Sequence, residues 1–421
     1  ISMEFPKIKA KVVVYEKEIQ LNEEILNDGV EVVYRKNKRM VVALQSENLP
    51  ESTWKLSKFD ILLATGGALG ITFEIIKNII TKGTTLILFG RTEVRKDAEI
   101  IANLPEEKQI ERKYQLREEL IGSGKKVTPV VLEKEWNLIY KSALVWKHIK
   151  ELRDLGATVY YESLDVTSSK SVASVMKKLG GQINLSEITH FIHGAGLEIS
   201  RPTTSKTIKE FEHVYSVKVD GFENIFKFLT PDTMKRVLAF TSIAGRFGNA
   251  TQADYSAANE YLAKRCRELV DIGVNATAID WSAWADVGMA TRGSTMTILS
   301  ALGITPIPLT DGIKRCIQEI EHGNEIEVVI SGELGQLTTK ASWYIGKKHP
   351  SIMLDTINTN SLKAYRTISI SKDRYLDDHR IGGKAVLPGV MGMETIAELS
   401  RVFEGESVYH LQDVKFKSAV K

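Results

Sequence analysis

The sequence predicts an α/β fold, in which a doubly wound parallel sheet carries a helical insertion and is followed by a smaller α+β segment. From Phe59 onward, apolar runs alternate with helical apolar spacing, which is the pattern of successive β-α-β units. The first run, "FDILLAT", passes through the Gly-rich turn "GGALG" into an amphipathic helix. Seven runs of this kind lie between residues 59 and 331, enough for one large sheet with helices on both faces. The expected strands are "FDILLAT", "TTLILFG", "ATVYYESLDV", "ITHFIHGAG", "RVLAFTSIAG", "GVNATAIDWSAW" and "EIEVVISG".

Composition narrows the class of protein. The chain has 421 residues, more than one hydrophobic core usually serves, so we expect two or three domains. With 43% hydrophobic and 26% charged residues it is typical of globular proteins, and a net charge of +3 is too small to indicate nucleic acid. No apolar run approaches the roughly 20 residues of a membrane-spanning helix. The two cysteines have no CxxC spacing, so we expect neither a disulfide framework nor a metal site, and a cytoplasmic location.

The chain divides into several predicted parts. Residues 1–57 alternate strand-like runs with turns and are expected to form a partial structural subdomain. Residues 58–340 form the large sheet domain, with residues 92–155 as a two-helix insertion that is either a docking surface or a solvated hairpin. A linker at 341–362 precedes a different unit at 363–421.

The turn "TGGALGIT", residues 65–72, predicts a dinucleotide site. Its glycines allow the backbone to approach a pyrophosphate at the positive end of the next helix. The position between a strand and a helix supports this interpretation over a merely tight turn. Arg91 ends the second strand, where an NAD site usually offers an acidic residue, so it favours NADPH unless it is an ordinary surface arginine. Asp165 and Val166 close the third strand, where the adenine is expected.

The predicted reaction centre begins at Ser242, which ends a strand. Tyr255 and Asn259 follow on the next helix, four residues apart and therefore on one face. A tyrosine has an ordinary pKa of about 10, so a proton-transferring Tyr255 needs a cation that Asn259 cannot supply. Lys218 lies in the preceding amphipathic helix among apolar residues, where an unpaired lysine would be costly. We favour Lys218 over Lys264, which is more than two helical turns beyond Tyr255.

Together, "TGGALGIT", "LFGR", "HGAG", "VKVDG", "TSIAGRFGNATQADYSAANEYL" and "IDWSAWADVGMA" resemble the ketoreductase domain of polyketide synthases and polyunsaturated fatty acid synthases. This branch of the short-chain dehydrogenase/reductases has a Rossmann sheet, and its catalytic Lys and Asn are exchanged relative to the wider superfamily. The resemblance covers residues 58–335. It implies reduction, with NADPH, of a β-ketoacyl chain carried by the phosphopantetheine of an acyl carrier protein. Other synthase domains are implied partners, and a homodimer is left open.

The resemblance also implies a role for each residue. Ser242 would bind the carbonyl, Tyr255 would donate the proton, and Lys218 would favour the tyrosinate and hold the nicotinamide ribose. Asn259 would position Lys218 or a water. His193 is expected to make a structural hydrogen bond. The predicted cofactor contacts are Thr65, Gly66, Gly67, Leu69, Gly70, Ile71, Arg91, Asp165, Val166, His193, Gly194, Ala195, Gly196, Lys218, Tyr255, Gly288 and Met289.

The sequence departs from the family pattern in the substrate region. "LEISRP" stands where many ketoreductases carry Leu-Asp-Asp, and Phe247 stands where the opposite stereochemical class has Trp. The configuration of the product is therefore open. The stretch from Gly288 resembles the mobile substrate lid.

The last segment carries a second motif. His379, Gly383 and Pro388 resemble the HxxxGxxxxP motif of hot-dog dehydratase domains from the same synthases, over residues 363–421. There the histidine removes an α-proton with help from a carboxylate of a second hot-dog half, which about sixty residues cannot include. The alternative is a histidine in a turn before a long helix.

Two further interpretations remain for the whole chain. One is a non-catalytic, reductase-derived scaffold that binds carrier protein or neighbouring domains. The other is a free-standing short-chain reductase for small alcohols, which the Lys218/Asn259 exchange disfavours.

Overall fold

The computed structural model describes most of the chain. The described residues are 4–5, 7–8, 10–15, 24, 30–36, 38–42, 44–124, 126–285, 287, 303–334, 356–358, 363–366, 368–370 and 373–404. They fall into two compact units, residues 1–10 with 47–339 and residues 11–46 with 340–421. Gly288 and Met289 of the predicted lid lie outside the described residues, as does most of the predicted linker.

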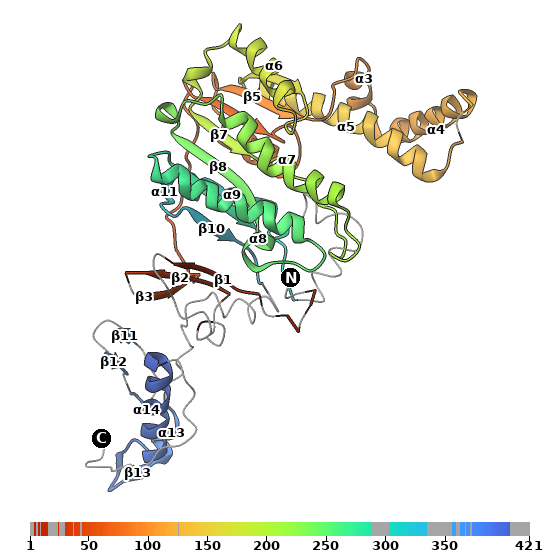
Figure 1. The fold of residues 1–421 in the computed structure, drawn as a ribbon. Coiled ribbons are helices and arrows are strands. Elements are labelled where there is room, and N and C mark those ends of the chain that lie inside the picture. The colour runs from red at the N-terminus through yellow and green to blue at the C-terminus, as the bar shows by residue number, and fades with distance from the viewer. Residues whose placement is uncertain are drawn as a thin grey trace. The chain divides into compact units, whose positions relative to one another are not determined.

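The first unit is built on a seven-stranded sheet in which every neighbouring pair is parallel (Figure 1). The strand order is β10-β9-β8-β7-β4-β5-β6. The chain therefore builds outward from β4 in one direction and then returns to build outward on its other side. This confirms the predicted doubly wound sheet and places its switch point between β4 and β7. The strands are β4 (Ile61–Thr65), β5 (Thr85–Gly90), β6 (Thr158–Ser163), β7 (His190–His193), β8 (Arg236–Ser242), β9 (Ala276–Trp281) and β10 (Glu327–Ile330).

Helices cover both faces of the sheet because the strands are apolar on both sides. One apolar core joins the sheet to α2, α5 and α11, and the other joins it to α6, α7 and α9. Both cysteines are buried, Cys316 in the first core and Cys266 in the second. The helices are α2 (Gly70–Ile79), α5 (Pro129–Asp154), α6 (Ser169–Gly180), α7 (Ile208–Phe226), α8 (Ile243–Phe247), α9 (Ala253–Asp271) and α11 (Leu309–His322).

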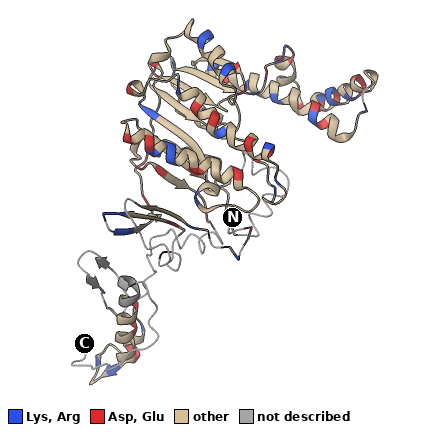
Figure 2. Cartoon of the chain, in the orientation of Figure 1, with Lys and Arg blue, Asp and Glu red and all other residues tan. Residues whose placement is uncertain are grey.

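The insertion differs from the two-helix prediction. It contains a short additional helix, α3 (Ala98–Ala102), before α4 (Glu106–Gly122). The two halves of the long helix α5 have different packing partners. The first half packs with α3 and α4, and the second half packs in the core of the sheet. It begins sharply, since the Thr128 side chain accepts a hydrogen bond from the Val131 N–H and Pro129 occupies the first turn. Acidic and basic residues are interspersed along this arm, with no stripe of one sign (Figure 2).

The second unit contains short elements. The three strand-like runs predicted near the start form β1 (Val12–Tyr15), β2 (Glu31–Arg35) and β3 (Lys38–Val41), with β1 parallel and β3 antiparallel to β2. The later part contains β11 (Thr356–Asn358), β12 (Lys363–Tyr365), α13 (Tyr375–Asp378), β13 (Arg380–Ile381), β14 (Lys384–Ala385) and α14 (Gly389–Glu404). None of the helices in the described part of the chain is long and apolar enough to cross a membrane.

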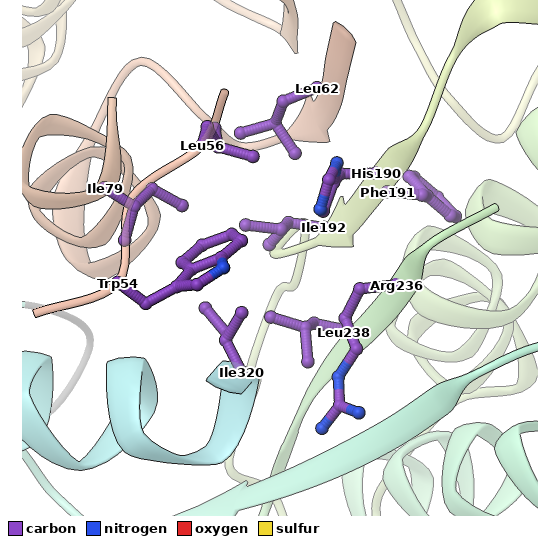
Figure 3. Close-up of a pocket in the computed structure, with 10 residues that line it drawn as sticks. All are labelled: Trp54, Leu56, Leu62, Ile79, His190, Phe191, Ile192, Arg236, Leu238 and Ile320. Carbon is purple, nitrogen blue, oxygen red and sulfur yellow. The ribbon is translucent and has the colours of Figure 1, made fainter. Parts of the chain in front are cut away.

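A cavity of about 10 Å³ lies where β4, β7 and β8 begin (Figure 3). Trp54, His190 and Arg236 contribute to its walls. That volume is at the lower limit for one water molecule, so the cavity cannot hold a substrate. In open α/β sheets, ligands bind at the opposite edge, where the parallel strands end.

Candidate active site at the carboxyl edge of the sheet

The Gly-rich turn lies at the switch point, directly after β4. Gly66 has a φ of +68°, and a Cβ built on it would lie 3.1 Å from the carbonyl oxygen of Gly194. The turn and the segment after β7 therefore approach one another too closely for a side chain. Gly70 also has a positive φ, of +61°, but a Cβ there would meet no atom within 4 Å. The first glycine thus serves the tight approach, and the space beside Gly70 is free for a ligand.

The start of α2 is suited to an anion. This helix begins at Gly70, and the side chain of the preceding residue, Leu69, makes no capping hydrogen bond. The first backbone N–H groups of a helix lack intrahelical acceptors and carry its positive dipole end. The chemistry of residues Thr65 to Thr72 is therefore compatible with the pyrophosphate of a dinucleotide, and the individual contacts stay a prediction.

His193 connects the two central strands. Its Nδ1 and the Thr65 hydroxyl are 3.0 Å apart, and the same hydroxyl accepts a hydrogen bond from the Ala195 N–H. Complete burial, with the Lys218 ammonium nearby, lowers the pKa of His193 to about 3, so the ring is neutral. The geometry gives His193 a structural hydrogen bond between β7 and β4.

The three residues proposed for the adenosine half lie just after the ends of β5 and β6. Arg91 is exposed directly after β5, whose Phe89 carbonyl accepts a hydrogen bond from the Gly66 N–H. Asp165 is exposed and its carboxylate accepts hydrogen bonds from the N–H and hydroxyl of Thr167. Val166 is buried against α7. The ends of these strands therefore place Arg91 and Asp165 on the same edge of the sheet as the Gly-rich turn.

Ser242, Tyr255 and Asn259 meet where β8 ends. The Ser242 hydroxyl accepts a hydrogen bond from the Ala244 N–H and so starts α8. Tyr255 and Asn259 lie in α9, and both are buried. The Asn259 amide nitrogen donates a 2.7 Å hydrogen bond to the backbone carbonyl of Tyr255, and a Cβ on Gly245 would lie 3.0 Å from the Asn259 Cβ. This glycine lets α8 pack against α9 beside the tyrosine.

Lys218 supplies a buried cation beside Tyr255. It comes from α7, which packs against α9, and only 3% of the residue is exposed. Its ammonium donates a 2.7 Å hydrogen bond to the Phe240 carbonyl and lies 5.9 Å from the centre of the Tyr255 ring. The rival Lys264 has half of its side chain exposed and pairs with Glu260 at 3.0 Å. Of the two lysines, the structure brings only Lys218 to the tyrosine.

The pKa of Tyr255 differs from the expectation that Lys218 favours the tyrosinate. Burial raises the pKa of Tyr255 to about 12, and hydrogen bonding to the side chains of Asn259 and Ser242 opposes that rise only in part. The phenol is therefore held in its protonated form. Burial lowers the pKa of Lys218 to about 8, an effect opposed by the Asp280 carboxyl. Lys218 and Asn259 flank Tyr255 through separate partners, and the described contacts include no hydrogen bond between the two.

Asp280 is a residue that the sequence reasoning missed. It lies in β9 beside Thr241 of β8, and only 1% of it is exposed. Burial, with Glu327 nearby, raises the pKa of its carboxyl well above the ordinary value. The available signal was an acidic residue inside an otherwise apolar strand, "ATAIDW".

His379 belongs to the second unit. It lies between α13 and the β13–β14 hairpin, whose turn residues Gly382 and Gly383 both have positive φ, and it is exposed. Its Nδ1 is 2.7 Å from the Val386 carbonyl and must donate to it. A carbonyl oxygen can only accept, so Nδ1 carries a proton in this contact and Nε2 is the ring nitrogen that does not take part in it. Pro388 directly precedes α14. Among the described residues, no cluster of three His, Cys, Asp or Glu side chains could hold a metal ion.

Comparisons with protein families agree with this arrangement. A family model described as KR domain matches residues 61–286, more than half of the chain. A second, described as polyketide synthase dehydratase domain, matches residues 353–421.

Curated relatives are much longer proteins. The chain is 28% identical over 373 residues to a polyunsaturated fatty acid synthase subunit of a Thraustochytrium species, a match covering 87% of the chain and 13% of that protein. It is 27% identical over 187 residues to mellein synthase of Phaeosphaeria nodorum, covering 44% of the chain and 10% of that protein. The chain therefore spans only a small part of the length of either relative.

Solved structures show the same fold. A ketoreductase domain from the bacillaene assembly line superposes with a TM-score of 0.61 at 23% identity, covering 81% of this chain and 74% of that one. An A1-type ketoreductase gives a TM-score of 0.60 at 16% identity, covering 78% and 61%. At these identities the likeness establishes the fold alone.

Proposed function

Because this chain belongs to the KR domain family, the ketoreductases of polyketide and polyunsaturated fatty acid synthases, we propose that it reduces a β-ketoacyl thioester with NADPH. The acyl chain would be carried by an acyl carrier protein, and the product would be the β-hydroxyacyl thioester. The single observation that supports this most strongly is that Tyr255 lies beside both the Ser242 side chain and the buried Lys218, where β8 ends.

The residues at this edge of the sheet suit this cofactor. The open space beside Gly70 and the uncapped start of α2 would hold the pyrophosphate, and the exposed Arg91 would hold the 2′-phosphate. When bound, NADPH supplies the hydride. Gly194, Ala195 and Gly196 follow β7 beside this space, and Lys218 packs against Gly196. Lys218 would thus lie near a ribose bound at this edge of the sheet.

The chain's own part in the reaction is placement and proton transfer. The Ser242 hydroxyl would donate a hydrogen bond to the substrate carbonyl. The Tyr255 hydroxyl, protonated at neutral pH, would then give its proton to the oxygen as negative charge develops there. The Lys218 cation would stabilise the resulting phenolate, and Asn259, buried beside Tyr255, would fix the ring through its backbone.

A direct experiment tests this function. The chain is mixed with NADPH and a β-ketoacyl N-acetylcysteamine thioester, and the loss of NADPH absorbance is followed while the product is identified by mass spectrometry. We expect the β-hydroxyacyl thioester to form in proportion to the NADPH consumed. NADPH binding without oxidation, across a series of acyl chain lengths, would favour the scaffold alternative.

Replacing Arg91 by Ala is expected to raise KM for NADPH about tenfold, because an exposed guanidinium–phosphate contact contributes on the order of 1.4 kcal/mol. KM for NADH should change less than twofold, since NADH lacks the 2′-phosphate. Initial rates with each cofactor measure both constants. Lys96→Ala removes another exposed cation from the same loop and should alter neither. An equal loss for NADH and NADPH in Arg91→Ala would contradict the assignment.

The rate is also expected to fall as pH rises. Burial lowers the pKa of Lys218 to about 8, so the cation predominates below pH 8 and is lost above it. If the cation is needed, kcat at pH 9 should be roughly a tenth of its value at pH 7. A pH profile at saturating NADPH measures this. A rate constant that stays level to pH 9.5 would show that the charge of Lys218 is not required.

The second unit supports a further proposal. The match of residues 353–421 to the dehydratase family, with the free Nε2 of His379, favours a role for this segment in a β-hydroxyacyl dehydratase. His379 would remove the α-proton once the segment is combined with a partner carboxylate. We also propose that the protein is located in the cytoplasm.

A further inference from the structure

A buried ion pair joins Lys206 to Asp254, the residue directly before Tyr255 in the chain. The Lys206 ammonium is 2.6 Å from Oδ2 of Asp254, and the two side chains are 4% and 0% exposed. Removing two charges from water is costly and is repaid only by close geometry and further hydrogen bonds. A buried pair of this kind is therefore expected to have a structural or functional role that an exposed ion pair need not have.

Each partner of the pair makes a second hydrogen bond. The other carboxylate oxygen of Asp254 accepts a 2.9 Å hydrogen bond from the backbone N–H of Tyr255. The Lys206 ammonium donates a second hydrogen bond, 2.8 Å long, to the Ile199 carbonyl. The pair thus ties the start of α9, which carries Tyr255, to the segment between β7 and α7.

That segment forms one wall beside Tyr255. Leu197 and Ile199 pack against the apolar cluster of Val214, Ala244 and Tyr255. Ile199 is the residue whose carbonyl Lys206 holds, so its position depends on the ion pair. A shift of this segment would move the wall relative to the tyrosine hydroxyl.

The remaining links between the two segments are more peripheral. The Arg201 N–H donates to the Thr251 carbonyl, and the Gln252 amide donates to the Ser200 hydroxyl. Thr251 has a φ of +69°, which is unfavourable for a β-branched residue and must be held by its surroundings. The Glu4 carboxylate accepts a hydrogen bond from its N–H. The ion pair is the buried link in this set.

We propose that Lys206 and Asp254 are positioning residues, whose ion pair holds the Tyr255 backbone and the Leu197–Ile199 wall in the geometry that reduction needs. The proposal rests on the proposed function, since it assigns Tyr255 the proton transfer. If the pair only stabilised the fold, variants that restore the stability of the protein would also restore kcat. If the pair positions Tyr255, kcat stays low even in a variant whose stability is restored.

The test compares four variants by kcat and KM with the N-acetylcysteamine thioester, by the Kd of NADPH and by the urea midpoint of unfolding. Lys206→Met and Asp254→Asn should each lower kcat about ten- to hundredfold, as small misplacements of catalytic groups do. Their Kd for NADPH should change less than about twofold, because the cofactor is held elsewhere. Lys206→Arg, which can keep both contacts, should retain most of the parent kcat.

The double variant, Lys206→Met with Asp254→Asn, separates the two roles. It leaves no unpaired buried charge, so its urea midpoint should recover toward that of the parent, while its kcat stays low. If kcat recovers together with the midpoint, the pair is only structural and the proposal is wrong. This variant also keeps the test decisive if a single variant does not fold. The control Lys150→Met breaks an exposed ion pair with Asp154 in α5 and should leave kcat unchanged.

Failure of the proposed function would be recognised separately, because the parent itself would then oxidise no NADPH. Hydrogen exchange would still test whether the ion pair holds the two backbone segments. We expect faster amide exchange in segments 197–207 and 251–256 of the double variant than in the parent. Unchanged exchange there would show that the pair holds neither segment and would overturn the proposal.

Discussion

Replacing Tyr255 by phenylalanine is expected to lower kcat for β-ketoacyl reduction by about two to four orders of magnitude. The change removes only the hydroxyl that would donate the proton. The ring keeps its packing against Val214 and Ala244, so the fold and the proposed cofactor site should be preserved. The Kd of NADPH, measured by fluorescence titration, should therefore remain within about twofold of the parent value.

Tyr261→Phe is the matched control for this prediction. Tyr261 lies in the same helix, and its hydroxyl donates a 3.3 Å hydrogen bond to Glu223, away from the reaction centre. Its removal should leave kcat unchanged. If Tyr255→Phe and Tyr261→Phe both reduce the thioester at the parent rate, Tyr255 is not the proton donor.

The second large effect is expected at Lys218. Lys218→Met keeps a long apolar side chain in the buried position and removes the charge, so a kcat loss of about a hundredfold or more is expected at pH 7. KM for NADPH should also rise, because Lys218 is proposed to hold the ribose. Steady-state rates at varied NADPH separate the two effects.

Lys264→Met provides the comparison that the sequence itself suggests. Lys264 is in the same helix as Tyr255 but is half exposed and paired with Glu260. Its loss should leave kcat near the parent value. The opposite result, with Lys264→Met inactive and Lys218→Met active, would return the catalytic cation to α9.

Much of the fold could be predicted because its signals are local. Each strand of the large sheet lies within a largely apolar run, and the connections between the runs carry helical spacing. The exception is α5, where one uninterrupted helical pattern passes from the insertion into the crossover of the sheet. Periodicity identifies such a helix but does not reveal that its two halves have different partners.

The position of Lys218 could be predicted because this residue conflicts with its surroundings. It is a charged residue among apolar neighbours on its helix, and the structure buries it near Tyr255, while its catalytic role stays a prediction. The Lys206–Asp254 pair was missed because its partners are 48 residues apart and Lys206 lies in an irregular segment. The raised pKa of Tyr255 was not predicted, because burial causes it and the sequence does not give the depth of burial.

One measurement tests the central claim most directly. The chain is given NADPH that carries deuterium at both C4 positions of the dihydronicotinamide, together with a β-ketoacyl chain on an acyl carrier protein, and the product is analysed by mass spectrometry. We predict one deuterium at the β-carbon of a β-hydroxyacyl product for each cofactor oxidised, and at most about a hundredth of that product with Tyr255→Phe over the same time. A protein that binds this cofactor but leaves the ketone unlabelled and unreduced would contradict the account.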